Sequence, residues 1–240
     1  MKNTLLFVLV ILFFSCGDNR SDAKIDSLKT DSILRSQQVI IPPPDSTGTD
    51  TIHTVALPPV FEGDIVMQIS DDPQHVAFGK ACGSKYNHVG IIFIRPRDRQ
   101  YIVLEMRDSI IVTPLIEWSA RGQGEHFVLL RMKKSNQILN EQKTAKLKKG
   151  AKKFNGINQD NYYSWADDEL YSTELIYKIY KQGLNIDICI PGKLGDLDLT
   201  GLLIHGQMMK KYGTNIPMDE RFISPDAIYK SPKMAIIYER

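Results

Sequence analysis

Residues 167–177 have the sequence DDELYSTELIY, and we expect this stretch to organise the fold. It predicts a tight entry into an amphipathic helix, because apolar residues follow at helical spacing from Leu175 to Tyr180. The first turn of a helix presents unpaired N–H groups and a positive dipole end, which favour a nucleophile that becomes negative and an oxyanion beside it. Ser172 stands at this helix start. The alternative is an ordinary cap, since helix starts prefer Ser, Thr and Asp.

The composition of the chain is that of an ordinary globular protein. Its 240 residues are 42% hydrophobic and 24% charged, which suits one domain and a tail once an N-terminal export segment is removed. The formal net charge is only +2, and the sequence has no arginine-rich run, zinc-ligand spacing or basic strand studded with aromatics. We therefore expect no nucleic-acid partner.

The N-terminus predicts an export signal that ends at Cys16. A short basic start precedes an apolar run over residues 4–14, which is too short to span a bilayer comfortably as a permanent helix. Residues 13–17, FFSCG, resemble a bacterial lipobox, which implies that Cys16 is the lipidated first residue of a mature lipoprotein. An ordinary cleaved signal and an uncleaved anchor are the alternatives, and the chain is exported in all three cases. We expect a location in the bacterial cell envelope, lipid-anchored to the membrane on its periplasmic or surface side.

A flexible tether is predicted after the signal. Residues 16–58 are rich in Asp, Ser, Thr and Pro, and the segment IPPPDSTGTD at residues 41–50 is the least able to fold. Its prolines favour an extended spacer. The predicted organisation is a signal peptide over residues 1–15, lipidated Cys16 and a tether over residues 16–58, and a folded domain over residues 59–240.

The folded domain is predicted to be α+β, with an antiparallel sheet packed against helices. The hydrophobic periodicity predicts strands at residues 65–69, 88–94, 101–106, 109–113, 126–132 and 234–238, and helices at residues 72–82, 114–120, 136–154 and 199–212. The strands at 88–94 and 101–106 are separated by a short turn, so we expect them to pair antiparallel. A meander is the simplest arrangement of the strands.

Two further features each allow two interpretations. The helix predicted at residues 136–154 carries lysines that form either a solvated face or a contact surface for anionic lipid or wall polymer. These lysines are Lys146, Lys148, Lys149, Lys152 and Lys153. The loop at residues 155–168 carries Tyr162, Tyr163 and Trp165, which either pack the loop down or line a cleft.

His88 and Glu105 are a candidate base and its orienting acid. His88 begins an apolar strand, and Glu105 stands near the end of the next one, where an acid is costly to bury without a partner. Antiparallel pairing brings Glu105 close to the His88 end, where its carboxylate can hold the imidazole. The plainer alternatives are a structural histidine and a surface salt bridge. Together with Ser172, the two residues supply the base, orienter and nucleophile of a covalent hydrolase.

Short motifs spread over the folded domain carry a family resemblance. They are EGDIV at 62–66, SKYNHVGI at 84–91, the strand with Glu105, TPL at 113–115 with Trp118, YSTEL at 171–175, YGTNIP at 212–217 and SPDAIY at 224–229. In this order they resemble the YiiX/YaeF-like hydrolases, which are circularly permuted relatives of the NlpC-type papain-like enzymes. The resemblance covers the chain from about residue 59 to its end.

The resemblance implies an α+β fold of the circularly permuted papain-like (NlpC-type) kind and an amidase or peptidase activity. His88 is then the base, Glu105 the orienting acid and residue 172 the nucleophile. Tyr171, Tyr86 and Asp64, which lie in the same motifs, are the candidate substrate-binding residues. A peptide or amide substrate, such as a peptidoglycan fragment, is implied, and neither a metal nor an organic cofactor is.

The chain departs from the family pattern at the nucleophile, where the family has cysteine and this chain has Ser172. A thiol is easily made a thiolate by a neighbouring imidazolium and a helix N-terminus, whereas an alcohol must lose its proton during attack. The serine is a natural variant, a mark of lost activity or a substitution introduced to trap substrate. The function is then an amidase, a binding module for wall fragments, or an acyltransferase or thioesterase that acts on lipids.

The cysteines of the folded domain are weaker candidates for the nucleophile. Cys82 falls late in a predicted helix, where the dipole disfavours a thiolate, so we expect it to be a small buried apolar residue. We expect the same of Cys189. A disulfide between the two stays open, since an exported protein permits one.

Overall fold

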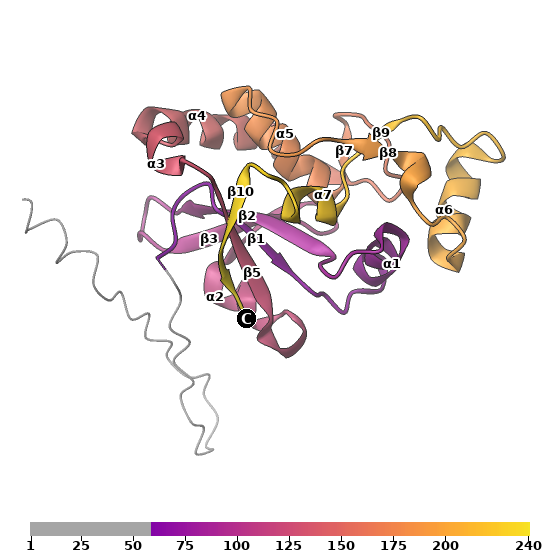
Figure 1. Ribbon diagram of the computed structural model, residues 1–240, viewed down its shortest axis with the longest axis horizontal. Coiled ribbons are helices and arrows are strands. Elements are labelled where there is room, and N and C mark those ends of the chain that lie inside the picture. The colour runs from indigo at the N-terminus through magenta and orange to yellow at the C-terminus, as the bar shows by residue number, and fades with distance from the viewer. Residues whose placement is uncertain (1–58) are drawn as a thin grey trace, which may run out of the picture. The chain divides into compact units, whose positions relative to one another are not determined.

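The computed structural model describes residues 59–240 and shows a six-stranded antiparallel sheet with helices on both faces (Figure 1). The predicted α+β class is confirmed. The signal peptide, Cys16 and the tether predicted for residues 1–58 lie outside the described residues. Within residues 59–240, no helix has both the length and the apolar character that crossing a membrane requires.

Apart from the helix predicted at residues 136–154, the predicted strands and helices form close to their predicted positions. The sheet consists of β1 (Ile65–Gln68), β2 (His88–Ile94), β3 (Tyr101–Met106), β4 (Ile110–Pro114), β5 (Phe127–Met132) and β10 (Met234–Glu239). The helices are α1 (Pro73–Cys82), α2 (Leu115–Ala120), α3 (Ser135–Ile138), α4 (Glu141–Lys152), α5 (Ser172–Leu184), α6 (Leu202–Tyr212) and α7 (Pro225–Tyr229). Two small sheets pair β6 (Asn158–Gln159) with β7 (Glu169–Leu170) and β8 (Gly192–Lys193) with β9 (Arg221–Phe222).

The strand order in the large sheet is β10-β5-β1-β2-β3-β4. The predicted antiparallel pairing of β2 with β3 is confirmed. The predicted meander is wrong for β5, which pairs with β1 and not with β4. Nearly every residue of β5 is buried, so this strand needs neighbours on both sides, whereas β4 exposes Ile111 and Val112 and lies at an edge.

Alternate residues of the strands point into two separate hydrophobic clusters. Ile65 and Met67 of β1 face the larger cluster, which α5 covers, whereas Val66 faces the smaller one, which contains Trp118 of α2. Helix α4 packs on α5 where Gly150 meets Gly183, and a Cβ on Gly150 would lie 3.1 Å from Gly183 Cα. The larger cluster therefore fixes α5 against the sheet.

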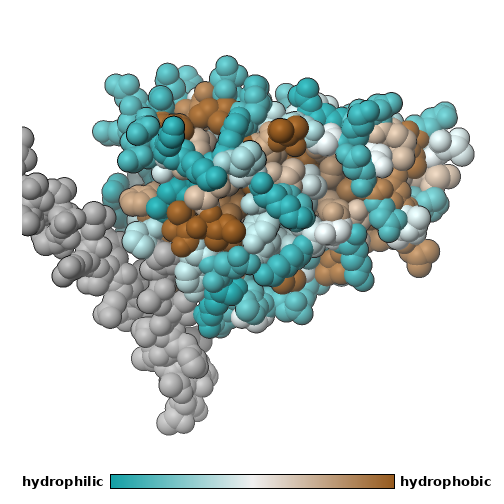
Figure 2. Space-filling view, viewed as in Figure 1, coloured by the Kyte–Doolittle hydropathy of each residue, from teal (hydrophilic) through white to brown (hydrophobic). Residues whose placement is uncertain are grey.

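The long helix predicted at residues 136–154 is wrong, because the chain breaks at Leu139 into α3 and α4. Asn140 caps α4 by accepting a hydrogen bond from Lys143 N at 3.0 Å, which is the local interaction that favours Asn at a helix start. Of the lysines noted in this segment, Lys148 pairs with Glu62 and the others are exposed. The surface over α3 and α4 is mainly hydrophilic in Figure 2, which agrees with both interpretations of the lysines.

Candidate active site

The antiparallel pairing of β2 with β3 brings His88 and Glu105 together. Gly90 lies opposite Glu105, and His88 lies two residues before Gly90 on the same face of β2. The Nε2 atom of His88 lies 2.6 Å from Oε2 of Glu105, and the side chains are only 2% and 0% exposed. A Cβ at position 90 would lie 2.2 Å from Val103 Cγ1, so the close approach of the two strands here requires glycine.

Glu105 is held as a buried carboxylate by three donors. Besides His88, Thr113 donates through Oγ1 and Arg121 through its guanidinium to Oε1, each at 2.5 Å. Burial opposes ionisation of this carboxyl, but the hydrogen bonds outweigh it and lower the pKa of Glu105 to about 2. In the sequence, Thr113 stood out only as part of a family motif. No local pattern pointed to Arg121, because its contact with Glu105 forms only when the chain folds.

The other ring nitrogen of His88 has no partner. Nδ1 is buried and makes no hydrogen bond to any of residues 59–240. When Nε2–H donates to the ionised Glu105, the tautomer of a neutral ring leaves a lone pair on Nδ1. That nitrogen can therefore accept a proton from a neighbouring group.

Ser172 is the first residue of α5, which begins without a side-chain cap. Tyr171 occupies the cap position, so the alternative that Ser172 serves as an ordinary cap is wrong. Thr173 donates through Oγ1 to Ile223 O at 2.6 Å, and the Tyr171 hydroxyl accepts from Ile223 N at 3.0 Å. These two bonds fix the start of the helix. The Ser172 side chain is 7% exposed and has no hydrogen bond within the described part of the chain.

Two cavities at the candidate site share one lining residue, His75 of α1. The larger has a volume of about 280 Å³ and is lined by Gln68, Ser70, Asp71, Asp72, His75, His88, Arg107 and Arg121. The smaller has a volume of about 10 Å³ and is lined by Gln74, His75, Phe78, Met106, Gln159, Tyr163, Tyr171 and Ser172. His88 and Ser172 thus border different cavities, and no hydrogen bond between them is present. No motif in the sequence points to His75.

Of the loop aromatics, Tyr163 both packs down and lines a cavity. Its ring is 2% exposed, stacks on Phe78 with centroids 5.0 Å apart and lines the smaller cavity. Trp165 lies under two cations, Lys178 and Arg221, at 4.8 and 5.1 Å from its ring centre. The loop therefore forms a wall of the Ser172 cavity and is itself fastened to the surrounding structure.

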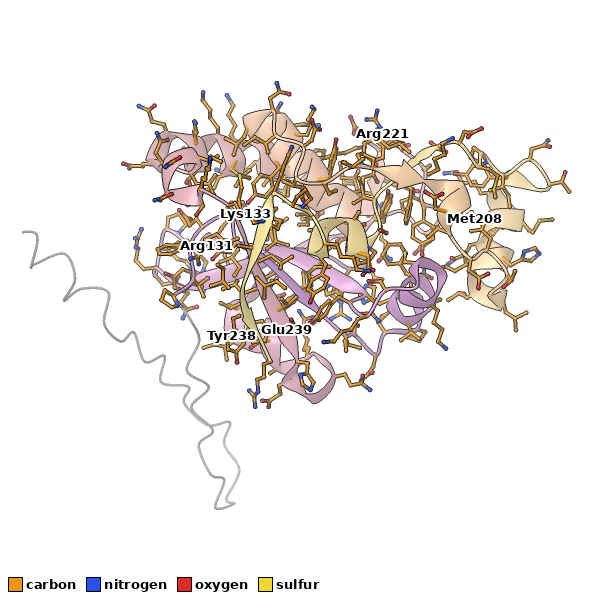
Figure 3. The ribbon with its side chains drawn as sticks, viewed as in Figure 1. Arg131, Lys133, Met208, Arg221, Tyr238 and Glu239 are labelled. Atoms are coloured by element: carbon orange, nitrogen blue, oxygen red, sulfur yellow. The ribbon has the colours of Figure 1, made fainter. Side chains whose placement is uncertain are left out.

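Two residues expected to bind substrate lie elsewhere. The Tyr86 hydroxyl donates to Glu239 at 2.6 Å, and Asp64 forms an ion pair with Arg131 at 2.7 Å; Figure 3 labels Glu239 and Arg131. Neither Tyr86 nor Asp64 lines either cavity. Tyr86 fastens β10 to the segment before β2, and Asp64 fastens β5 to the start of the domain. The structure therefore does not place either side chain with His88 and Glu105.

The two cysteines of the described residues are free thiols, and no disulfide joins them. Burial raises the pKa of Cys189 to about 12 and the pKa of Cys82 still further. Both thiols are therefore held in their unreactive protonated form, and neither lines the cavities beside His88 and Ser172.

Glu174 is a buried acid in the first turn of α5. It is 0% exposed, and its Oε1 lies 2.7 Å from Nζ of Lys178, which also bonds Asp167. Burial outweighs the attraction of Lys178 and raises the pKa of Glu174 to about 8. The carboxyl therefore binds its proton more tightly in the folded chain than in the unfolded one.

We expect Glu174→Gln to flatten the pH dependence of stability. Because the folded pKa is raised, the stabilising contribution is complete at pH values below the unfolded pKa and is lost as the pH rises through about 8. The amide of Gln does not titrate, so its contribution to stability stays constant over this range. The difference in unfolding free energy between pH 5 and pH 8 should therefore shrink by about 1 to 3 kcal/mol. Urea unfolding at the two pH values measures it. An unchanged difference would mean that Glu174 is already ionised at pH 5.

One solved structure and one further protein are similar to this chain. The chain superposes on the crystal structure of metalloprotein yiiX from Escherichia coli O157:H7 with a TM-score of 0.66 and 31% sequence identity, covering 75% of this chain and 97% of that one. It is also 31% identical over 175 residues to the uncharacterized protein YiiX of Escherichia coli strain K12, covering 73% of this chain and 84% of that protein.

The side chains at the site of this chain do not fit a metal ion. Residues 59–240 contain no group of three or more His, Cys, Asp or Glu side chains placed to hold one. His75 and His88 are stacked face to face, with ring centroids 4.3 Å apart, so their nitrogens do not converge on one point. Glu105 is already bound by three donors.

The family model that matches this chain is the permuted papain-like amidase enzyme, YaeF/YiiX, C92 family, over residues 60–238. The match extends over almost the whole described domain. It confirms the resemblance drawn from the short motifs and, with the superposed structure, the permuted papain-like fold. This chain therefore belongs to the YaeF/YiiX family of permuted papain-like amidases.

Proposed function

We propose that this chain is an exported amidase or peptidase in which residue 172 is the nucleophile, His88 the base and Glu105 the orienting acid. One observation carries the assignment. Glu105 holds Nε2 of the buried His88 at 2.6 Å, while Nδ1 of the same ring has no partner. A base needs this combination of one fixed nitrogen and one that is free to take a proton.

The reaction then follows the logic of covalent acyl transfer. Residue 172 attacks the carbonyl carbon of the amide and gives its proton to Nδ1 of His88. The developing oxyanion is stabilised by the N–H of residue 172, since the first N–H groups of a helix have no intrahelical acceptor. The imidazolium, stabilised by Glu105, protonates the leaving amine, and water releases the acyl group by the same route in reverse.

The substrate class follows from the amidase family and from the expected location. An exported enzyme anchored at Cys16 and extended on a tether over residues 16–58 reaches cell-wall peptides, so we propose that residues 59–240 form a hydrolase domain acting on peptidoglycan fragments. Tyr171 and Tyr163 line the cavity of residue 172 and would contact such a substrate.

The anchor has a direct test in the cell. We expect Cys16→Ser to move the protein from the membrane fraction to the soluble envelope fraction and to abolish labelling by a radioactive fatty acid, because the lipid is carried by this thiol. Cys82→Ser, which alters a partly buried thiol of the folded domain, is the matched control and should stay in the membrane fraction. Membrane retention of Cys16→Ser without lipid label would favour an uncleaved anchor.

A second candidate is a binding module that retains the cleft without the chemistry. It is favoured by the serine at position 172, whose hydroxyl makes no hydrogen bond to His88 and borders a cavity of only about 10 Å³. The test compares this chain, Ser172→Cys and Ser172→Cys with His88→Ala on peptidoglycan fragments and ester probes. Activity in Ser172→Cys alone supports a thiol-type site, and fragment binding without turnover in all three supports the binding module.

A further inference from the structure

His75 is a second buried histidine beside the candidate base. It lies in the first turn of α1, is 7% exposed and has no part in the mechanism proposed above. Its backbone N–H donates to Asp72 at 3.3 Å, and its Nδ1 lies 2.9 Å from the hydroxyl of Ser70. These bonds fix both the main chain and the ring of His75, so the ring does not depend on His88 for its orientation.

The rings of His75 and His88 are stacked. Their centroids are 4.3 Å apart and their planes differ by 23°. Trp118 of α2 supplies a second near-parallel ring, with its centroid 6.0 Å from that of His88 and a plane difference of 24°. A hydrogen bond to Glu105 fixes where Nε2 lies but leaves the ring free to swing about that bond. Flat contact with a fixed neighbour removes this freedom and so determines where Nδ1 points.

The charge of His75 suits this position. Burial and the nearby His88 lower the pKa of His75 to about 3, and Arg107 acts in the same direction, whereas Asp72 and Glu105 act against it. His75 is therefore neutral at physiological pH. A neutral ring can stack on His88 without repelling the proton that His88 must carry in the imidazolium form, which a cation at the same place would do.

We propose that His75 is a positioning residue for His88, acting through ring stacking to aim Nδ1 at residue 172. The position of His75 is suited to this, because it is the one residue that lines both the cavity of His88 and the cavity of residue 172. The proposal rests on the proposed function for its catalytic consequence, but the orientation of the His88 ring can be measured without any turnover.

NMR contacts between the His88 ring protons and Trp118 test the ring orientation directly. In this chain we expect the contacts of one fixed orientation of the His88 ring. His75→Phe keeps a flat ring and should preserve those contacts, whereas His75→Ala should weaken and average them, because the ring then swings about its bond to Glu105. His126→Ala, which removes an exposed histidine outside both cavities, is the matched control. Contacts of the His88 ring that stay unchanged in His75→Ala overturn the proposal.

Kinetics in the Ser172→Cys background test the consequence. We expect His75→Ala to lower kcat by about tenfold to a hundredfold with little change in KM, and His75→Phe to recover most of the loss. His75→Lys places a cation beside His88, disfavours the imidazolium and should move the acidic limb of the kcat/KM profile to lower pH. Unaltered kcat and pH profile in both His75→Ala and His75→Lys contradict the proposal. An inactive Ser172→Cys with His75 intact contradicts the proposed function instead, while the NMR result still decides the role of His75.

Discussion

Ser172→Cys is expected to raise kcat/KM toward peptide amides by on the order of a thousandfold. The cysteine would stand as the first residue of α5, where unpaired N–H groups and the helix dipole stabilise a thiolate, and His88 can take its proton. The serine hydroxyl at this position is a far weaker acid and must lose its proton as it attacks. Amide hydrolysis at this site should therefore be slow with a serine hydroxyl as the nucleophile and fast with a cysteine thiol.

The gain must depend on both His88 and the new thiol. His88→Ala in the Ser172→Cys background should return activity to the level of the present chain, because this variant lacks the ring whose unpartnered Nδ1 takes the proton. Cys82 and Cys189 have raised pKa values, so alkylation by iodoacetamide at neutral pH should modify the introduced cysteine first. Equal activity in the present chain, Ser172→Cys and the double variant would remove residue 172 and His88 from the mechanism.

Elements with a strong local pattern could be predicted from the sequence. The strand β2 forms at its predicted bounds because seven consecutive residues after a polar turn are mostly apolar. Helix α1 begins at Pro73 with Asp72 as its cap, and both are local signals that mark a helix start. The pairing of β2 with β3, and hence the contact of His88 with Glu105, followed from the short turn between them.

The parts that failed depend on contacts distant in the sequence. The position of β5 beside β1 depends on how α2 packs on the sheet, which no local pattern encodes. The guanidinium of Arg121 and the ring of His75 reach the site from separate helical segments. The family motif around Tyr86 suggested a binding residue, but the Tyr86 hydroxyl donates to Glu239 of the last strand. Contacts within one hairpin could thus be predicted from the sequence, whereas contacts between separate segments of the chain could not.

Glu105→Gln is expected to lower turnover strongly. The amide cannot stabilise the imidazolium as the carboxylate does. If its NH2 group donates to Nε2 of His88, the neutral ring carries its proton on Nδ1, which is the wrong tautomer for a base. In the Ser172→Cys background we expect kcat to fall by about a hundredfold to ten-thousandfold. Glu117→Gln, on the exposed face of α2, is the matched control and should leave kcat unchanged.

The same substitution has a stability consequence with the opposite pH dependence to that of Glu174. The folded pKa of Glu105 is lowered to about 2, so its contribution is present above the unfolded pKa and is lost as the pH falls through about 2. That contribution is on the order of 3 kcal/mol. Glu105→Gln should therefore unfold more easily in urea at pH 7 and lose less stability between pH 5 and pH 2 than the present chain. If kcat falls while the urea unfolding of Glu105→Gln matches that of the present chain at every pH, Glu105 acts only on the imidazolium. If stability falls and kcat does not, the bond to His88 serves the fold, and the assignment of Glu105 as the orienting acid is wrong.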